Sequence, residues 1–230
     1  KYLIISSVLE KQHFIPSHLR DRERKKFFVL APVLHEEKTI ERFLNDLSSQ
    51  DYLKEFLEVY VITTEKEHLN NVRPNTIDIL NRLKSEQKIS ELRLNIIHYP
   101  KIDGFKTHQL GCAFQQIRNA HGDNVVTNSY FLFLDADSVV DPGTISRFNN
   151  TIESGIEIYQ QPLLWFKNIK DIKSPIMQSF AFQQSFFSIS YEIPMFTEKF
   201  FPWRLKYFVG HGLCVRGSFL LRIGGFPDII

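Results

Sequence analysis

Two carboxylates that follow an apolar run are the residues of this chain best suited to chemistry. Tyr130–Leu134 is apolar throughout and leads into Asp135 and Asp137, which are one residue apart. Carboxylates at the edge of a core repel each other and lose hydration, and a divalent cation offsets both costs. Oxygen ligands suit Mg²⁺ or Mn²⁺, so the pattern indicates a metal site for a phosphorylated substrate. The alternative is a strand end where the acids face water and Asp141 caps the next helix.

Three other segments bring polar groups or glycines to places where a ligand can approach. Glu36 follows an apolar run, although an acid there also offsets the dipole of a following helix. Lys106 stands near a helix start after Gly104 and is within reach of a phosphate, but a single lysine also fits open solvent. The segment 210–212, Gly-His-Gly, lies in a strand-like pattern and favours either close approach to a ligand or a bulge.

The spacing of apolar residues predicts the elements that position these groups. Apolar runs predict strands at 27–34, 58–63, 94–99, 130–134, 156–160 and 207–215, and helical periodicity predicts helices near 40–47, 76–87 and after residue 106. Strands that alternate with helices predict an α/β fold with a Rossmann-like, mostly parallel central sheet and helices on both faces. In such sheets the ligand-binding loops follow the carboxyl ends of the strands.

Composition limits the classes of protein to which the chain can belong. With 28 Lys plus Arg against 26 Asp plus Glu, the net charge is +2, so no overall basic field favours nucleic acid as a partner. Two cysteines give neither a disulfide framework nor metal-ligand spacing, which favours a reducing compartment. A length of 230 residues suits one sizeable domain, or at most two small ones. We predict a lead-in over residues 1–26, which is either a solvated linker or a basic membrane contact, and a single domain over residues 27–230.

Aromatic residues are concentrated in the last third of the chain. The sequence has 21 phenylalanines, and many of them fall between residues 180 and 208, interleaved with Lys and Arg. Core packing is the usual explanation for any one of them, and an interfacial or lipid-facing surface is the alternative. Ser174 and Pro175 predict the start of a helix in this region. Further on, we expect Ser218 to cap a short helix that Gly224 and Gly225 terminate.

Taken together, these segments resemble the GT-A domain of family-2 glycosyltransferases, which are inverting enzymes that use nucleotide-sugar donors. The resemblance covers about residues 28–228. Its pieces occur in the order of the family: PVLHEE at 32–37, GFKTHQL at 104–110, FLDADS at 133–138, YQQP at 159–162, and GHGLCVR followed by GGFPD at 210–228.

The resemblance implies roles for particular residues. Asp137, with Asp135, would hold Mn²⁺ or Mg²⁺, and Asp135 would lie near the ribose; these two are the predicted catalytic carboxylates. Lys106 would approach the uracil or the diphosphate. The remaining predicted donor-binding residues are Pro32 and Glu36 in the nucleoside pocket, Glu65 after the second strand, and Gly210, His211 and Gly212 beside the sugar.

Three departures from the family pattern qualify these roles. His35 stands where the family often has Asn. The second strand ends in Thr63 and Thr64 instead of acids that touch the nucleoside, with Glu65 as a substitute. The general base of the family follows the GGFP segment, so we expect it to lie outside these 230 residues and expect the chain alone to transfer sugar poorly.

The sequence therefore predicts a metal-dependent domain that transfers sugar from a nucleotide diphosphate donor, with a UDP-sugar favoured, to a glycan or lipid-linked acceptor. By resemblance, the parent protein would be membrane-associated and would work at the cytoplasmic face. One alternative is an inactive glycosyltransferase-like module for binding or scaffolding. The other is a nucleotidyltransferase, which would show a Gly- and Arg-rich loop after the first strand, and 32–37 shows none.

Overall fold

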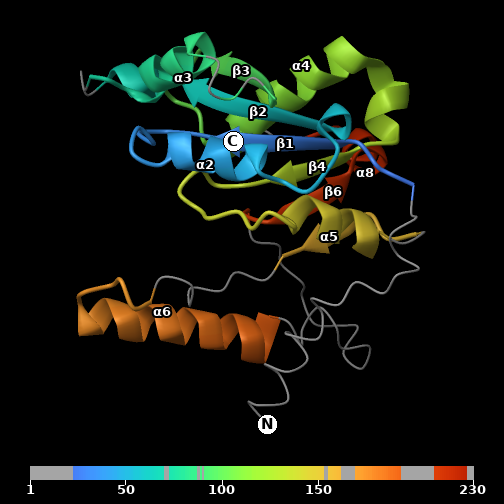
Figure 1. Ribbon diagram of the computed structural model, residues 1–230. Coiled ribbons are helices and arrows are strands. Elements are labelled where there is room, and N and C mark those ends of the chain that lie inside the picture. Colours follow the sequence, from blue (N-terminus) through green and yellow to red (C-terminus); the bar gives the residue numbers. More distant parts are fainter. Residues whose placement is uncertain are drawn as a thin grey trace.

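The structure, a computed structural model, describes residues 23–69, 73–86, 89, 91–152, 155–161, 169–192 and 210–226. Its centre is a six-stranded sheet in the order β3-β2-β1-β4-β6-β5 (Figure 1). Neighbouring strands pair in parallel from β3 to β4, and β6 is antiparallel to both of its neighbours, β4 and β5. The strands are β1 (Phe27–Pro32), β2 (Leu57–Thr64), β3 (Arg93–Tyr99), β4 (Tyr130–Phe133), β5 (Ile158–Gln160) and β6 (Leu213–Arg216).

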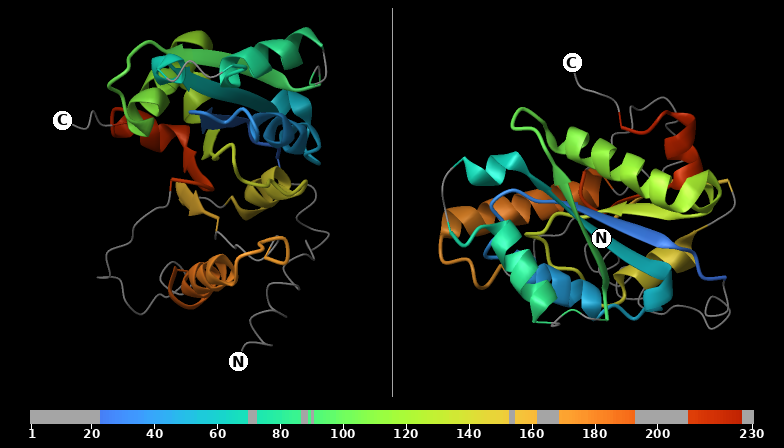
Figure 2. Two further views of the ribbon diagram at one scale, coloured as in Figure 1. Left: turned by 90° about the vertical axis from the view of Figure 1, so that its left-hand side faces the viewer. Right: turned by 90° about the horizontal axis from the view of Figure 1, so that it is seen from above.

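Helices cover both faces of the sheet, as Figure 2 shows from two further directions. One face packs against α2 (Ile40–Ser48), α3 (Thr76–Ser85) and α5 (Thr144–Thr151), and the other against α4 (Lys106–Thr127) and α8 (Gly217–Arg222). Short turns of 3-10 helix, η2 (Lys54–Phe56) and η3 (Glu65–His68), flank β2. The predicted mostly parallel α/β sheet with helices on both faces is confirmed.

The central strand β1 shows why both faces are covered. Successive side chains of a strand point to opposite faces. Phe27, Val29 and Ala31 enter the core on the α2 side, whereas Phe28 and Leu30 enter the core on the α4 side. All five are fully buried. A strand that is apolar at every position therefore needs a helix layer on each side.

The order of the strands fixes where ligands can bind. From β1 the chain adds β2 and then β3 on one side, and it returns to place β4 on the other side of β1. Loops that leave the carboxyl ends of β1 and β4 consequently diverge, which opens a crevice at this edge of the sheet.

Three sequence predictions about local structure need correction or completion. The segment 210–212 precedes β6 and does not lie within a strand, because Gly212 adopts a left-handed φ of 67°. Ser218 does not cap α8; the N-cap is Arg216. Several predicted parts lie outside the described residues, namely 162, 193–206, 227–228 and residues 207–209 of the predicted last strand. Residues 1–22 of the predicted lead-in also lie outside them, so the boundary of the lead-in stays a prediction.

Helix α6 (Pro175–Phe187) begins where the sequence predicts. The hydroxyl of Ser174 accepts a hydrogen bond from the Met177 N–H, and Pro175 occupies the first turn. A π-helical turn, η4 (Ser188–Glu192), continues it. Among the described residues, no helix is both long enough and apolar enough to cross a membrane.

Candidate functional site

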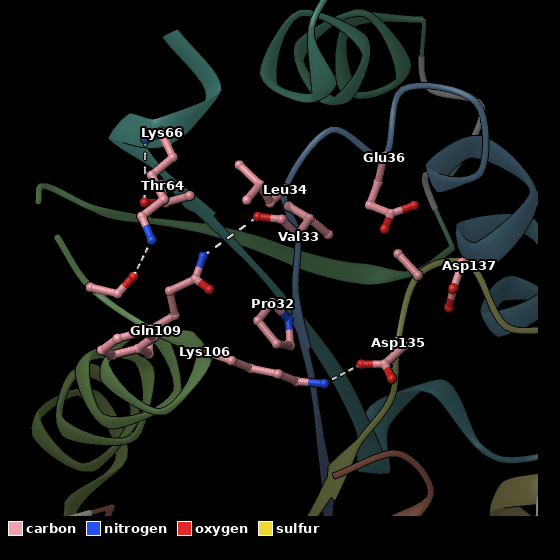
Figure 3. A pocket seen from close by; sticks show the side chains of 13 residues that line it. Pro32, Val33, Leu34, Glu36, Thr64, Lys66, Lys106, Gln109, Asp135 and Asp137 are labelled. Atoms are coloured by element: carbon pink, nitrogen blue, oxygen red, sulfur yellow. Dashed lines mark hydrogen bonds and ion pairs between the residues drawn. The ribbon is translucent and has the colours of Figure 1, made fainter. Parts of the chain in front are cut away.

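An open pocket of about 320 Å³ lies at the carboxyl edge of the sheet, at the point where the loops after β1 and β4 diverge. Figure 3 shows its side chains from close by. The strand ends, the first turn of α4 and the loop after β4 all contribute to it. The lining residues are Pro32, Val33, Leu34, Glu36, Thr64, Lys66, Gly104, Phe105, Lys106, Gln109, Asp135, Ala136 and Asp137.

The loop that carries the two aspartates is held from both sides. On one side, Arg42 of α2 donates a hydrogen bond to the backbone oxygen of Asp137 at 2.6 Å, and Asp46 accepts one from the Val140 N–H at 3.2 Å. The Ser138 N–H also closes a turn onto the Asp135 carbonyl. These contacts fix the direction in which the carboxylates leave the strand. Gly143 is the N-cap of α5, so Asp141 does not have the capping position that the alternative interpretation gave it.

On the other side, the segment 210–212 supports the same loop. The Gly212 N–H donates to the Phe133 carbonyl at 2.7 Å, and Nδ1 of His211 accepts the Asp135 N–H at 3.0 Å. Because Nδ1 accepts, the imidazole carries its proton on Nε2. Burial lowers the pKa of His211, the charge of Lys106 lowers it further, and Asp135 and Asp137 act against both. The imidazole is therefore a neutral support for the backbone of the aspartate loop.

Lys106 and Asp135 form an ion pair across the pocket, drawn as a dashed line in Figure 3. Lys106 is the first residue of α4 and Asp135 follows β4, so the pair joins opposite walls. A Cβ on Gly210 would lie 3.9 Å from the Lys106 ammonium, which places the glycine segment beside this pair. The structure thus brings Lys106, Asp135 and the 210–212 segment together.

The predicted residues after β1 and β2 separate into two groups. Pro32 and Glu36 line the pocket, and the Glu36 N–H is anchored by the Thr76 hydroxyl at 3.0 Å. Glu65 does not line it: η3 directs Glu65 toward His98, and their side chains meet at 3.0 Å. The neighbours Thr64 and Lys66 line the pocket instead.

Comparison with known protein families assigns this domain to a family. The family model described as glycosyl transferase family 2 matches residues 28–211, which include every element that lines the pocket. The chain belongs to this family. Membership sets aside the nucleotidyltransferase alternative. A search of curated proteins found no match to this family-2 domain.

Solved structures of two glycosyltransferases share the fold of this family-2 domain. The mannosyltransferase PcManGT from Pyrobaculum calidifontis, in complex with GDP-Man and Mn²⁺, has a TM-score of 0.58 at 18% identity, over 97% of this chain and 59% of that one. TarS 1-349 from S. aureus, in complex with UDP-GlcNAc, has a TM-score of 0.50 at 18% identity, over 86% and 47%. These likenesses show a GT-A fold, and the chain spans about half the length of each structure.

The carboxylates of Asp135 and Asp137 are of the kind that binds a divalent cation. The Asp137 side chain is exposed, and its only hydrogen bond among the described residues is a long one from Ser138, at 3.4 Å. The Asp135 carboxylate is engaged by Lys106. No cluster of three or more metal-binding side chains occurs in the described part of the chain. Asp137 can therefore supply one ligand, and the remaining ligands would have to come from Asp135, from water or from a bound diphosphate.

Sequence reasoning missed several residues that build this site. Arg42 is an exposed residue of α2 that resembles any surface arginine until its contact with Asp137 is seen. Glu67 is buried, and its carboxylate accepts the His35 N–H at 2.8 Å, which holds His35 at a left-handed φ of 59°. Lys66 donates to the Gly104 carbonyl at 2.6 Å. Only the acid at position 67 could have been noted in advance, as a carboxylate close to the end of the second strand.

Proposed function

We propose that this domain transfers a sugar from a nucleotide diphosphate donor, with a UDP-sugar favoured, to a glycan or lipid-linked acceptor by inverting displacement. The observation that carries the proposal is the convergence of Lys106, Asp135 and Asp137 on one pocket at the switch point of a family-2 fold. The Lys106 ammonium suits a diphosphate, and the two carboxylates suit the metal ion that accompanies it. The nucleotide sugars and the Mn²⁺ in the two similar structures support the same ligand class.

In the proposed reaction, an acceptor hydroxyl attacks the anomeric carbon on the face opposite the diphosphate. A new carbon–oxygen bond forms, and the bond from that carbon to the phosphate oxygen breaks, with its electrons leaving on the nucleoside diphosphate. The hydroxyl proton passes to a general base. Our prediction that this base lies outside the 230 residues stays a prediction.

The residues of this chain would act on the donor. Lys106 would leave Asp135 to pair with the diphosphate, and Asp137, with Asp135, would hold Mn²⁺ or Mg²⁺. When bound, the cation offsets the charge that develops on the leaving diphosphate. His211 and Arg42 would keep the aspartate loop in position, because both bind its backbone.

Titration of the protein with UDP, with and without Mn²⁺, tests the proposal. We expect binding that requires the metal and that is lost in Asp137→Ala. Glu55→Ala is a matched control, because Glu55 is an exposed acid at the amino end of β2, away from the pocket. Absence of UDP binding under every condition would favour the inactive scaffold. Sugar transfer by the 230-residue chain, measured against a longer form of the protein, tests the prediction about the base.

We also propose that the parent protein is membrane-associated at the cytoplasmic face, with α6 in contact with the lipid surface. The helix exposes apolar side chains on most of its circumference and buries only Ala181 and Ser185. No charged residue occurs between positions 174 and 191, while Lys170 and Lys173 precede the helix. The exposed apolar side chains of α6 are Ile176, Met177, Phe180, Phe182, Phe186 and Phe187, and η4 adds Tyr191.

Exposed aromatic side chains beside lysines suit the interface of an anionic bilayer. Sedimentation with neutral vesicles and with vesicles that contain anionic lipid tests this contact. We expect the wild type to bind the anionic vesicles and the pair Phe180→Ser with Phe187→Ser to bind them less. Gln183→Ser is the control on the same helix. Equal binding by both variants would refute the contact.

A further inference from the structure

Gln109, on the first turn of α4, has a side chain whose orientation is fixed by the sheet. It is only 8% exposed, and its Nε2 donates to the backbone oxygens of Ile62 at 3.3 Å and Val33 at 3.5 Å. Both partners are carbonyls and can only accept, so the amide nitrogen must face the strand ends. The carbonyl oxygen, Oε1, must then point away from them.

Oε1 of Gln109 has no hydrogen-bond partner in the described parts of the chain, and it is not shut off from solvent. Gln109 lines the pocket, where Figure 3 shows it with Thr64 and Lys66 on the side away from Asp137. One side of the pocket thus carries the two carboxylates, and the other carries a fixed, neutral acceptor together with Lys66. Phe105, which is 60% exposed, adds an aromatic ring to the wall of the pocket.

Other groups near the end of β2 are already engaged. The Thr64 hydroxyl donates to the Lys101 carbonyl at 3.3 Å and accepts the Lys66 backbone N–H at 3.5 Å. The Thr63 hydroxyl meets Nδ1 of His98 at 3.0 Å. Glu65 pairs with the same His98. None of the three therefore directs a free acceptor into the pocket. The Lys66 ammonium, held by the Gly104 carbonyl, keeps further N–H donors on this side.

We infer that Oε1 of Gln109 accepts a hydrogen bond from the ring N–H of the donor's uracil base and so selects the base. The inference rests on the proposed function and adds to it the residue that reads the nucleotide. In uracil the N3–H stands between two carbonyls, which suits an acceptor beside the donors of Lys66. In cytosine the same ring position is an unprotonated nitrogen, whose lone pair would face the lone pairs of Oε1.

Binding of UDP and CDP to the wild type and to Gln109→Met tests the inference. Methionine has a similar length but lacks the acceptor. An unpaired polar group in a binding site weakens affinity by about tenfold or more, so we expect the wild type to prefer UDP by at least that factor. We expect Gln109→Met to bind UDP about tenfold more weakly and CDP nearly unchanged. Thermal unfolding of the variant confirms that it is folded.

A purely structural role for Gln109 predicts a different result. If Gln109 only ties α4 to the strand ends, the variant weakens both nucleotides by the same factor, and the inference is overturned. A wild type that binds UDP and CDP equally also overturns it and leaves the proposed function standing. A wild type that binds no nucleotide at all removes both.

A second measurement avoids any change to the protein. UDP methylated at N3 has no ring N–H, so we expect the wild type to bind it at least tenfold more weakly than UDP. Equal affinity for the two compounds would count against Gln109 as the reader of the base, even if Gln109→Met fails to fold.

Discussion

Replacement of His211 tests how the aspartate loop is held. Its imidazole side chain is 11% exposed, and its Nδ1 is the acceptor for the Asp135 N–H at 3.0 Å. His211→Ala removes this acceptor and leaves a part-buried donor without a partner, which costs about 1–3 kcal/mol. For a domain of this size, about 2 kcal/mol corresponds to a fall in Tm of about 4–8 °C. His211→Asn is the matched variant, because its Oδ1 can take nearly the position of Nδ1.

The assay is thermal unfolding of both variants at neutral pH, followed by titration with UDP and Mn²⁺. We expect His211→Ala to unfold several degrees earlier and to bind UDP about tenfold more weakly. Binding must then order the aspartate loop, and a cost of about 1.4 kcal/mol for this ordering corresponds to a factor of about ten in affinity. We expect His211→Asn to keep most of both properties. Equal losses in the two variants, or no loss in either, would refute the reasoning about the hydrogen bond.

The burial of His211 gives the stability of the protein a pH dependence with a definite sign. Burial holds the pKa of His211 below its usual value, so the unfolded chain takes up a proton at a higher pH than the folded protein does. Stability should therefore fall as the pH is lowered through about 6.5, the usual histidine value, and level off below the folded pKa. We expect Tm measured against pH to fall less steeply in His211→Asn. Identical profiles would contradict this.

Two further predictions concern the frame around the site. The buried Glu58 carboxylate accepts from Lys26 at 2.6 Å and from Tyr60 at 2.9 Å; burial raises the pKa of Glu58, but these hydrogen bonds and the Lys26 charge outweigh it and leave it lowered. The stabilisation is complete above about pH 4.5 and is lost as pH falls through the folded pKa. In denaturant titrations, Glu58→Gln should therefore cost about 1–3 kcal/mol of unfolding free energy at pH 7 and should make stability fall less steeply in acid. An unchanged dependence of stability on acid pH would count against this prediction. A Cβ on Gly217 would lie 1.8 Å from the Val126 carbonyl oxygen, so Gly217→Ala should destabilise the protein by about 3 kcal/mol or more. Gly111→Ala, whose Cβ would make only an ordinary 3.7 Å contact, should be nearly neutral. Similar unfolding midpoints for the two variants would show that the close packing at Gly217 is not rigid.

Much of the fold follows from the sequence because its signals are local. Runs such as Phe27–Ala31 are apolar at every position, and that pattern fits a strand buried on both faces. The placement of Asp135 and Lys106 on facing walls follows from the rule that loops gather at the carboxyl edge of a parallel sheet. These features need only the order of the elements.

The parts that could not be predicted depend on backbone turns and on distant contacts. Gly212 takes a left-handed φ that periodicity does not reveal, so the predicted last strand wrongly included residues 210–212. The direction of Glu65 is set by η3, which turns it toward His98 and brings Lys66 to the pocket. Gln109 looks like an ordinary helix residue, and its role depends on strand ends 47 and 76 positions away.

The position of β6 has a consequence for the newly made chain. β6 inserts between β4 and β5, although residues 213–216 are synthesised after both. Until they emerge from the ribosome, β4 presents an open row of backbone N–H and C=O groups, and β5 has no sheet partner. The aspartate loop also lacks His211 during this interval. The nascent domain therefore passes through a stage that is prone to mispairing, and the aspartate loop gains the support of His211 only in the last steps of folding.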